Sequence, residues 1–484
     1  MKTDYKFVEY GRFSSEFEYS QLFKLCIEKN GVQTGPFGSQ LHKEDYVAQG
    51  TPIITVEHLG DNRIIHIDTP FVTDDDKNRL QKYQMKEGDI IFSRVGSVDR
   101  RALVRKDEDG WLFSGRCLCV RVDKTKINPT YLSYFFGLES FKKYIRGIAV
   151  GATMPSINTK ILSDVPVYYP KNLNQQKQIA KILSDLDDKI HLNNQINQTL
   201  ESIAQAIFKS WFIDFEPVRA KISAKQTGQD PELAAMYAIS GKSEAELEQM
   251  AKEDFAELQA TAALFPDELV ESELGEMPKG WEILDIDKTT SLIIDHRGKT
   301  PKKLGADWSD SGVIALSAKH IKDGCIVNRE QLRFVDTELY NKWMKEELKE
   351  GDILLTSEGP MGEMYYLAFD EKYCLSQRLY ALRANTDLIS STFLYFWLLS
   401  PFAKSDMNGR ATGTTVVGIR QSELRKVKVL TPSKSICDLF HRKIMPNLKQ
   451  IALNNNESVN LAQIRDILLP KLLTGDFDIG LSDE

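Results

Sequence analysis

Short apolar runs recur in both halves of the chain and predict β-strands. In the first half, the runs bounded by Gly, Asp or Pro are TPIITVEHL (51–59), GDIIFSRV (88–95) and CLCVRV (117–122). In the second half, the runs are GVIALSAKHI (312–321), GDILLTS (351–357) and LYALRA (379–384). Residues 128–145 and 389–407 are amphipathic, with Thr or Ser near the expected N-cap, so each predicts a helix. The chain is therefore expected to contain mixed α/β units.

These patterns belong to an internal duplication. Four blocks recur in the same order at offsets of 261 to 263 residues: 86–96 with 349–359, 114–122 with 376–384, 151–170 with 413–432, and 192–212 with 453–473. A period this long is far beyond that of a solenoid repeat, so each copy must be a domain-sized unit. Two similar but non-identical units predict a pseudo-two-fold chain that performs one kind of task on two different targets.

A long helix with a heptad pattern is predicted after each unit, over 175–212 and 433–475. In the first helix, the seam positions, spaced alternately by four and three, are Ile179, Leu183, Leu186, Ile190, Asn193, Asn197, Leu200, Ala204, Ile207 and Trp211. The second helix keeps Ile451, Asn454, Leu461, Ile464, Leu468 and Leu472, and Pro446 is expected to kink its start. An apolar seam must be buried, so we expect the two helices to pair.

The negative charge of the chain is concentrated between the repeats. Segment 213–280 holds 15 acidic and 6 basic residues, whereas the whole chain carries a net charge of only −7. The repeated units are therefore close to neutral, which permits nucleic-acid binding without requiring it. The connector is rich in Ala, Glu and Leu and predicts helix, while its Pro- and Gly-bearing part, 217–231, is compatible with either order or disorder.

The sequence offers little support for catalysis, a metal site or membrane insertion. SGKS (240–243) lacks the leading glycine of a phosphate-binding loop, and NPTY (128–131) lacks the second proline of an amino-methyltransferase site. Six cysteines show no CxxC pair, and seven histidines show no metal-binding spacing. Without a signal-peptide core or an apolar run of ~20 residues, the expectation is a reduced, cytoplasmic, non-catalytic protein without a metal ion.

Three pairs of matching loops have the composition of binding loops. Residues 32–39 and 295–303 are Gly/Pro turns with polar side chains, and the second carries four cations. The turns 55–60 and 317–322 align His58 with His320, and the Gly-rich loops 93–101 and 356–364 carry different polar tips. Such loops can approach phosphates, and different tips on a repeated scaffold suit dual specificity. Solvated surface turns and structural histidines are the alternative interpretation.

Taken together, these motifs resemble the specificity (S) subunit of type I restriction–modification enzymes. The resemblance extends over roughly 15–475 and rests on the KEGDI strands, the His-containing turns, the S-x-R strands, the segment at 413–432 and LGEMPKGWE (274–282). The sequence departs from the family pattern at the entry to the first unit, FEYSQLFKLCIEKNG (17–31), which has no counterpart of LGEMPKGWE.

The resemblance implies a fold and a set of partners. The fold is mixed α+β, with two target-recognition domains separated by two long antiparallel, coiled-coil-like helices. The expected divisions are 1–171 and 274–432 for the domains, 172–273 for the first helix with its connector, and 433–484 for the second helix and tail. Each domain would read one half of a bipartite, asymmetric sequence in double-stranded DNA. Two modification (methyltransferase) subunits and the restriction subunits would dock on the helices. S-adenosylmethionine, ATP and Mg would bind those partners, which act in adenine methylation and DNA cleavage.

The expected DNA contacts lie on the loops named above. Phosphate contacts are expected from Lys43, Arg297, Lys299, Lys302 and Lys303. Base-edge contacts are expected from Gln33, Arg94, Lys319, His320 and Glu358. Thr34, His58, Thr300 and Ser357 complete the loop set, while Arg116 and Arg378 match each other and serve either DNA or the fold. Two other classes stay open: a duplicated scaffold that binds only protein, and a self-contained adenine methyltransferase, against which the missing glycine-rich motif argues.

Overall fold

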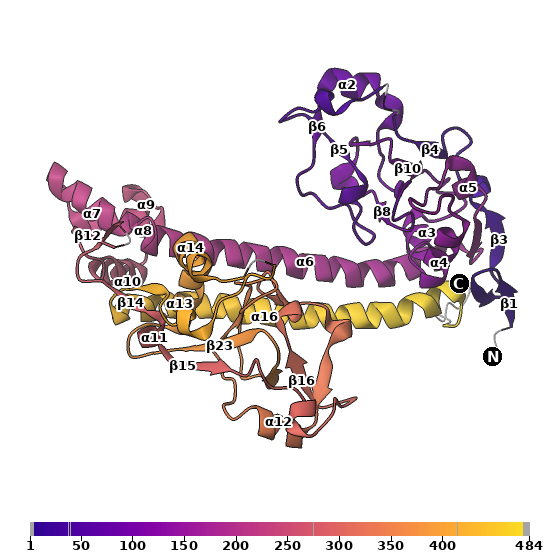
Figure 1. The fold of residues 1–484 in the computed structure, drawn as a ribbon. Coiled ribbons are helices and arrows are strands. Elements are labelled where there is room, and N and C mark those ends of the chain that lie inside the picture. Colours follow the sequence, from indigo (N-terminus) through magenta and orange to yellow (C-terminus); the bar gives the residue numbers. More distant parts are fainter. Residues whose placement is uncertain (1–3, 37, 39, 274, 414, 478–484) are drawn as a thin grey trace. The chain divides into compact units, whose positions relative to one another are not determined.

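The computed structural model describes residues 4–36, 38, 40–273, 275–413 and 415–477. The chain divides into two compact units. Unit 1 comprises Met1–Leu192 with Glu457–Glu484, and unit 2 comprises Asn193–Asn456. Each unit therefore holds one repeat together with part of both long helices, α6 (Leu173–Phe212) and α16 (Lys434–Thr474) (Figure 1).

Unit 1 is a mixed α/β structure. Its strands are β1 (Tyr5–Val8), β2 (Gly11–Ser14), β3 (Glu18–Gln21), β4 (Val32–Thr34), β5 (Thr51–Ile54), β6 (Phe71–Val72), β7 (Ile90–Ser93), β8 (Arg101–Leu103), β9 (Leu112–Phe113), β10 (Cys117–Val120) and β11 (Pro166–Tyr169). Its shorter helices are α1 (Leu22–Leu25), α2 (Asp74–Arg79), α3 (Pro129–Phe135), α4 (Glu139–Ile148) and α5 (Thr159–Ser163). An antiparallel sheet with the order β4-β10-β7-β8 lies beside a three-stranded sheet, β6-β5-β9, in which β5 and β9 are parallel.

Unit 2 repeats this arrangement. Its strands are β12 (Leu269–Ser272), β13 (Gly275–Pro278), β14 (Glu282–Asp285), β15 (Thr290–Asp295), β16 (Val313–Leu316), β17 (Ile321–Lys322), β18 (Cys325–Ile326), β19 (Arg333–Val335), β20 (Ile353–Thr356), β21 (Met364–Tyr366), β22 (Tyr373–Leu375), β23 (Leu379–Ala384) and β24 (Lys428–Thr431). Its shorter helices after the connector are α11 (Ile286–Thr289), α12 (Thr337–Trp343), α13 (Ser391–Leu399), α14 (Pro401–Arg410) and α15 (Gln421–Leu424). The orders β15-β23-β20-β21 and β19-β16-β22 match those of unit 1, so the duplication extends to topology.

The four-stranded sheet of each unit is buried on both faces. In β7, Ile90 and Phe92 face the core that contains α3, whereas Ile91 faces the core that contains β5. In β20, Ile353 and Leu354 divide in the same way between two cores. Successive side chains of a strand point to opposite faces, so burial on both sides explains why these strands are continuous apolar runs.

The repeated KEGD sequence serves the fold. Asp89 accepts a hydrogen bond from the backbone of Lys86 over 2.8 Å and pairs with Arg121 on the neighbouring chain segment. Asp352 accepts from Lys349 over 2.9 Å and pairs with Arg383 over 2.7 Å in unit 2. Each aspartate thus closes the turn that precedes the central strand and holds the adjacent strand, a structural reason for this motif to occur twice.

Two sequence expectations about element boundaries need correction. The entry to unit 1 does have a counterpart in unit 2, because hairpin β1–β2 matches hairpin β12–β13, and β3 pairs with β11 as β14 pairs with β24. The backbone is repeated here although the side chains differ. The helices predicted over 128–145 and 389–407 are each two helices, because the chain turns between α3 and α4 and between α13 and α14, where Ser400 caps α14 and Pro401 begins it.

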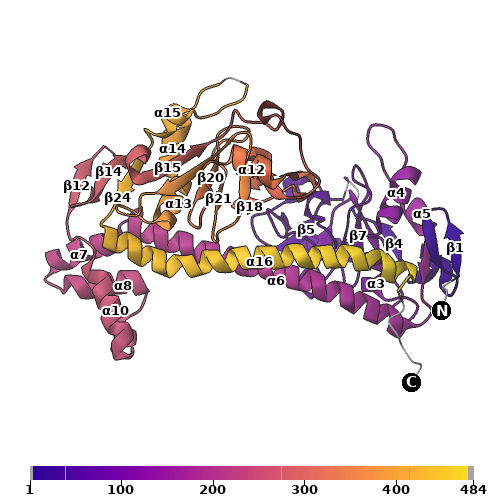
Figure 2. The ribbon, with the colours of Figure 1, turned by 90° about the horizontal axis from the view of Figure 1, so that it is seen from below.

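The two long helices pair antiparallel within each unit. In unit 2, Asn197 of α6 bonds to Asn454 of α16, while Phe212, farther along α6, packs on Phe440, earlier in α16. In unit 1, Lys189 pairs with Glu457 over 3.2 Å, and Asp187 pairs with Arg465 over 2.6 Å. Figures 1 and 2 show the two helices side by side. α16 is continuous through Pro446, the residue expected to kink it.

The structure places the seam residues on the paired faces, with one exception. The buried or half-buried seam residues are Ile179, Leu183, Leu186, Ile190, Asn193, Asn197, Leu200, Ala204, Ile207, Trp211, Ile451, Asn454, Leu461, Leu468 and Leu472. Ile464 is instead 47% exposed. Arg465 occupies the paired face there and bonds to Asp187, so a polar contact replaces the apolar one that the heptad predicted.

The acidic connector is a helical subdomain of unit 2. It contains α7 (Glu216–Thr227), α8 (Pro231–Ser240), α9 (Glu244–Glu248) and α10 (Lys252–Ala263). Met236, Leu247 and Ala262 form a small core, and Lys221 donates to the carbonyl of Phe265 over 2.8 Å. Segment 217–231, for which order and disorder were both open, is mostly helix α7. None of the helices in the described ranges is long and apolar enough to span a membrane.

Candidate nucleic-acid interface

Three segments that are distant in sequence meet around one cavity of unit 2. They are the turn after β15, the 3₁₀ turn η6 (Ala318–His320) after β16, and the turn before β23. The cavity has a volume of about 300 Å³. Its polar and aromatic lining comprises Thr300, Trp308, Ser317, Lys319, His320, Gln331, Arg333, Trp343, Ser376, Gln377 and Arg378. Thr300, Lys319, His320 and Arg378 belong to the predicted DNA-binding set, so the fold brings part of that set together.

Aromatic rings form part of the wall of this cavity. The rings of Trp308 and Trp343 are 6.3 Å apart, and the guanidinium of Arg333 lies 5.1 Å from the ring centroid of Trp308. Trp343 is fully buried, and its indole Nε1 has no hydrogen-bond partner among the described residues. Rings and guanidinium planes are surfaces on which bases and sugars pack, while the exposed edge of Arg333 can still donate hydrogen bonds.

Cations and amides at the mouth of the cavity supply donors and acceptors for a nucleic acid. Lys319 Nζ donates to Gln331 Oε1 over 3.0 Å, and both side chains are exposed. Arg378 pairs with Glu358 over 3.0 Å, and its backbone φ of 65° lies in the left-handed region. A non-glycine residue with positive φ is uncommon and indicates a tightly determined turn. The cavity therefore combines positive charge with side chains of the kind that can form hydrogen bonds to base edges.

Both aligned histidines have a structural role, and their contact with DNA stays a prediction. Nδ1 of His58 accepts from the backbone of Thr55 over 3.0 Å, and Nδ1 of His320 accepts from Ser317 over 3.1 Å. Both rings are buried and close a capping box around their 3₁₀ turns. Burial, and then the nearby Lys319, lower the pKa of His320, which keeps its imidazole neutral at pH 7.

The basic turn after β15 uses part of its charge internally. Arg297 makes two bonds of 2.8 and 2.9 Å to Asp295 and lies 4.2 Å from the ring centroid of Tyr380. Lys299 donates to the carbonyl of Trp343, and burial followed by Lys345 lowers its pKa. Lys303 donates to the carbonyl of Gly298 over 3.0 Å, while the side chain of Lys302 is exposed and forms no hydrogen bond or ion pair with another described residue. Lys302 and Lys303 thus remain placed for phosphate contact, and Arg297 holds the turn.

Two other residues expected to contact DNA are buried. Ser357 is 1% exposed, and its backbone bonds to Arg378 and Ile419, so the half-buried Glu358 is the first residue of that loop that reaches the surface. Gln33 points into unit 1, where its Nε2 donates to the carbonyl of Lys82 over 3.2 Å. Both residues were expected on polar loops, whereas Gln33 lies within β4 and Ser357 directly follows β20, in a sheet that is buried on both faces.

The remaining predicted residues of unit 1 lie on several separate elements. Thr34 lies in β4 and pairs with Leu118, and Arg94 Nη1 donates to the carbonyl of Gly115 over 3.3 Å. Arg116, which matches Arg378, is exposed. The side chain of Lys43 lies outside the described part of the chain.

Sequence reasoning missed seven polar or aromatic residues of the cavity, which are Trp308, Ser317, Gln331, Arg333, Trp343, Ser376 and Gln377. Gln377 adjoins Arg378 in the S-x-R motif, and Trp308 follows the basic turn closely, so both carried a local signal. Gln331, Arg333 and Trp343 come from the η7 turn (Arg329–Gln331), from β19 and from α12, segments that carry no repeated motif. The pairing of β16 with β19 brings Arg333 to the site.

The comparisons with known proteins agree with this architecture. The family model of the type I restriction modification DNA specificity domain matches residues 21–202 and again residues 278–463. The chain is 32% identical over 445 residues to the type I restriction enzyme HindI specificity subunit of Haemophilus influenzae, covering 88% of this chain and 94% of the relative. It is 25% identical over 364 residues to the MjaIX specificity subunit of Methanocaldococcus jannaschii, covering 74% and 71% of the two chains.

A solved structure has the same fold. The S subunit of a type I restriction–modification system from M. genitalium superposes with a TM-score of 0.57 at 14% identity, covering 94% of this chain and 96% of that one. At this identity the likeness concerns the fold alone. The family model, in contrast, covers more than half of the chain and occurs once in each repeat. The chain therefore belongs to the family of type I restriction–modification specificity subunits, the non-catalytic DNA-recognition components of these systems.

Proposed function

We propose that this specificity subunit reads an asymmetric, bipartite sequence in double-stranded DNA, with one half-site for each unit. The observation that carries the proposal is that two units share one strand order but present different side chains. The turn after β20 offers Glu358, whereas its counterpart after β7 offers Arg94 and Val95. Loops that differ on a common scaffold read different base edges, so the two half-sites differ in sequence.

Within unit 2, the proposal divides the contacts into two classes. Lys302 and Lys303 lie on an exposed turn without an acid partner, which suits sequence-independent contact with phosphates. Gln331, Arg333, Gln377 and the Glu358–Arg378 pair combine donors and acceptors around the cavity, which suits base reading. Arginine and glutamine are the side chains that most often form paired hydrogen bonds to guanine and adenine.

The proposal also assigns the chemistry to partner subunits that dock on the long helices. S-adenosylmethionine would bind two modification subunits, and ATP and Mg the restriction subunits. The described residues contain no group of three or more His, Cys, Asp or Glu that could hold a metal ion. Support for docking comes from apolar side chains left exposed on α6 and α16, which are Leu192, Ile196, Ile203, Leu453, Ile464 and Ile467. The cytoplasm, where DNA and these partners meet, is the proposed location.

The alternative, a duplicated scaffold that binds protein but not DNA, makes a different prediction. If the assembled complex binds DNA, its lysines and arginines neutralise phosphates and release counterions. The logarithm of its binding constant should then fall linearly with the logarithm of the salt concentration. We therefore propose to titrate the complex of this chain and its modification subunits with a duplex that carries the methylated site, at several salt concentrations. Tight, salt-dependent and sequence-selective binding supports the proposal. Binding of partners without any selective DNA binding supports the scaffold.

A further inference from the structure

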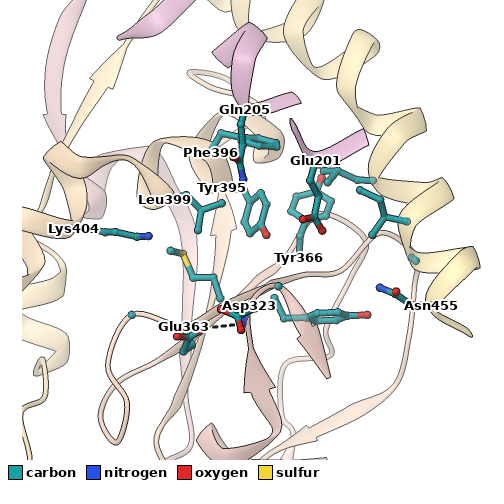
Figure 3. Close-up of a pocket in the computed structure, with 17 residues that line it drawn as sticks. Glu201, Gln205, Asp323, Glu363, Tyr366, Tyr395, Phe396, Leu399, Lys404 and Asn455 are labelled. Carbon is teal, nitrogen blue, oxygen red and sulfur yellow. Dashed lines mark hydrogen bonds between the residues drawn. The ribbon is translucent and has the colours of Figure 1, made fainter. Parts of the chain in front are cut away.

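A second cavity of unit 2 lies between the recognition fold and the two long helices (Figure 3). Its volume is about 290 Å³. Glu201 and Gln205 of α6 line one side, and Asn455 of α16 lines another. The β17–β18 hairpin contributes Asp323, a residue in the left-handed region with a φ of 48°, and the chain before and within β21 contributes Glu363 and Tyr366. We call this the Glu201 cavity.

A buried phenol without a partner points into the Glu201 cavity. Tyr395 of α13 is 8% exposed, and its hydroxyl forms no hydrogen bond with any other described residue. Figure 3 shows the hydroxyl directed into the cavity. The hydroxyl of Tyr366, in contrast, bonds to Ser391 Oγ over 2.8 Å. The hydroxyl of Tyr395 can therefore accept a hydrogen bond from a donor that enters the cavity.

The charge of the Glu201 cavity is negative and largely uncompensated. Its lining holds three carboxylates, of Glu201, Asp323 and Glu363, and one cation, Lys404. Glu363 Oε2 accepts from the backbone of Asp323 over 2.8 Å, but Glu201 has neither an ion pair nor a hydrogen bond among the described residues. Burial, and then the charge of Asp323, raise the pKa of Glu201. A phosphate would be repelled here, whereas a cation would relieve both effects.

The duplication shows what occupies the equivalent place in unit 1. A cavity of about 390 Å³ there is lined by Asp61, Arg101 and Lys142, among others. Asp61 and Lys142 match Asp323 and Lys404 at an offset of 262. Arg101 matches Met364, because both begin the strand that pairs with the central strand, in the same register.

Arg101 satisfies the acidic site of unit 1 from within the chain. Its side chain is 3% exposed, its Nη1 lies 3.2 Å from Asp61 Oδ1, and its Nε donates to the carbonyl of Ser133 over 2.9 Å. Unit 2 keeps the aspartate and the hairpin that carries it but has Met364 in place of the arginine. The acidic site of unit 2 therefore lacks the guanidinium that its counterpart contains.

We propose that the Glu201 cavity accepts a basic side chain, with an arginine guanidinium as the best fit, from the modification subunit that docks on this chain. This inference rests on the docking function proposed above. The guanidinium would take the place that Arg101 fills in unit 1, pairing with Glu201 and Asp323 and donating to the hydroxyl of Tyr395. Tyrosine ring faces add a further attraction for a cation.

Exposed apolar side chains on the same helices as Glu201 and Lys404 favour a side chain of a protein over a free cation. Ile203, two residues after Glu201, is 45% exposed, and Phe402, two residues before Lys404, is 43% exposed. A free cation would leave these apolar side chains in water, whereas a docked polypeptide would bury them. Helix α6 also presents Gln198, Thr199 and Ser202 on the open face that adjoins Glu201.

The first test removes the charge. The full chain with Glu201→Gln should bind the purified modification subunit at least about tenfold more weakly in calorimetric titrations, because a buried ion pair loses one partner. Tyr395→Phe should weaken docking less. Glu253→Gln, at an exposed position of connector helix α10, is the matched control and should dock normally. Unchanged docking by Glu201→Gln would overturn the proposal.

The second test supplies the missing cation within the chain. Met364→Arg recreates the arginine of unit 1, so it should compete with the partner's side chain and weaken docking, while the thermal midpoint of the isolated chain stays equal or rises. Leu264→Arg, which adds the same charge to an exposed position of the connector, should leave docking unchanged. Normal docking by a folded Met364→Arg chain would contradict the proposal.

The third test distinguishes a free cation from a protein side chain as the occupant of the cavity. It also distinguishes a failure of this inference from a failure of the proposed function. Methylguanidinium should inhibit docking of the wild-type chain at millimolar concentrations and have little effect on the Met364→Arg chain. If methylguanidinium binds the isolated chain but no cavity variant changes docking, the cavity takes a free cation and the proposal fails while the proposed function stands. If the wild-type chain does not dock with its modification subunit at all, the proposed function fails, and the inference with it.

Discussion

The side-chain amide of Asn454 donates a hydrogen bond to Oδ1 of Asn197 over 2.8 Å, which joins α16 to α6 at a place where both side chains are buried. Asn197 in turn donates to Oδ1 of Asn455 over 2.8 Å. The polar positions in this otherwise apolar seam therefore satisfy one another. Because the bonds form only in one alignment, they select the antiparallel register at some cost in stability.

Removing one member of this pair should destabilise the chain. Asn197→Ala leaves the buried amide of Asn454 without its acceptor, at a cost of about 1–3 kcal/mol in the free energy of unfolding. Replacing both residues by leucine should restore most of the stability, because two apolar side chains suit a seam, but should loosen the register. Chemical denaturation followed by circular dichroism would measure both variants. An Asn197→Ala chain as stable as the wild type would show that the hydrogen bonds do not contribute.

The lysines of the turn after β15 should affect all DNA sequences alike. Lys302→Ala with Lys303→Ala should weaken binding of the assembled complex to every duplex and reduce the salt dependence by up to ~0.9 in log–log slope for each lost phosphate contact. Lys252→Ala, in the exposed connector, is the control. Arg297→Ala should instead lower thermal stability, since Arg297 holds Asp295 and stacks on Tyr380. If the Lys302 and Lys303 variant instead loses its selectivity between DNA sequences with no change in salt dependence, the assignment of these lysines to phosphate contact is wrong.

The Glu358–Arg378 pair should influence one half-site only. Glu358→Gln removes the carboxylate that holds Arg378 over 3.0 Å and leaves the guanidinium free to find another acceptor. The base preference of the half-site read by unit 2 should relax or change, with an effect of roughly 1–3 kcal/mol for a good base contact. Competition binding with duplexes altered in one half-site at a time measures this effect. An equal change in both half-sites would contradict the assignment.

The carboxyl of Glu201 predicts a dependence of stability on pH. Its pKa is raised in the folded chain, first by burial and then by Asp323, with Glu363 and Lys404 also lining the cavity. A raised pKa means that the folded state favours the protonated carboxyl. The stability that comes from this protonation is complete below the pKa of Glu201 in the unfolded chain and is lost as pH rises through its pKa in the folded chain. Glu201→Gln should therefore stabilise the isolated chain near pH 7 and have little effect at acid pH. Thermal unfolding across this range would show the difference, and a pH-independent effect would contradict it.

Most of the architecture could be predicted from the sequence, because the duplication shows the same structural motifs in both repeats. The KEGD motif, in which Asp89 and Asp352 each close a turn and hold an arginine, marks the central strand of each unit. The heptad spacing predicted the long helices to within a few residues. It failed at Ile464, because the ion pair of Asp187 with Arg465 depends on the facing helix.

The candidate site could be predicted only in part. Exposed turns such as that of Lys302 follow from local composition, but the burial of Gln33 and Ser357 follows from a sheet covered on both faces. The histidines aligned by the repeat, His58 and His320, cap the same turn in each unit, so a structural role is enough to explain their repetition. Arg333 reached the cavity through the pairing of β16 with β19, a non-local contact without a sequence signal.

The most direct test of the account maps the methylated bases in cells that carry this chain with its modification subunits, by sequencing that detects methylation. The wild-type chain should give one asymmetric, interrupted motif. A chain with Gln331→Ala and Arg333→Ala in unit 2 should keep one half of that motif unchanged and relax the other. A single uninterrupted motif, or a change in both halves from these two substitutions, would contradict the claim that each unit reads its own half-site.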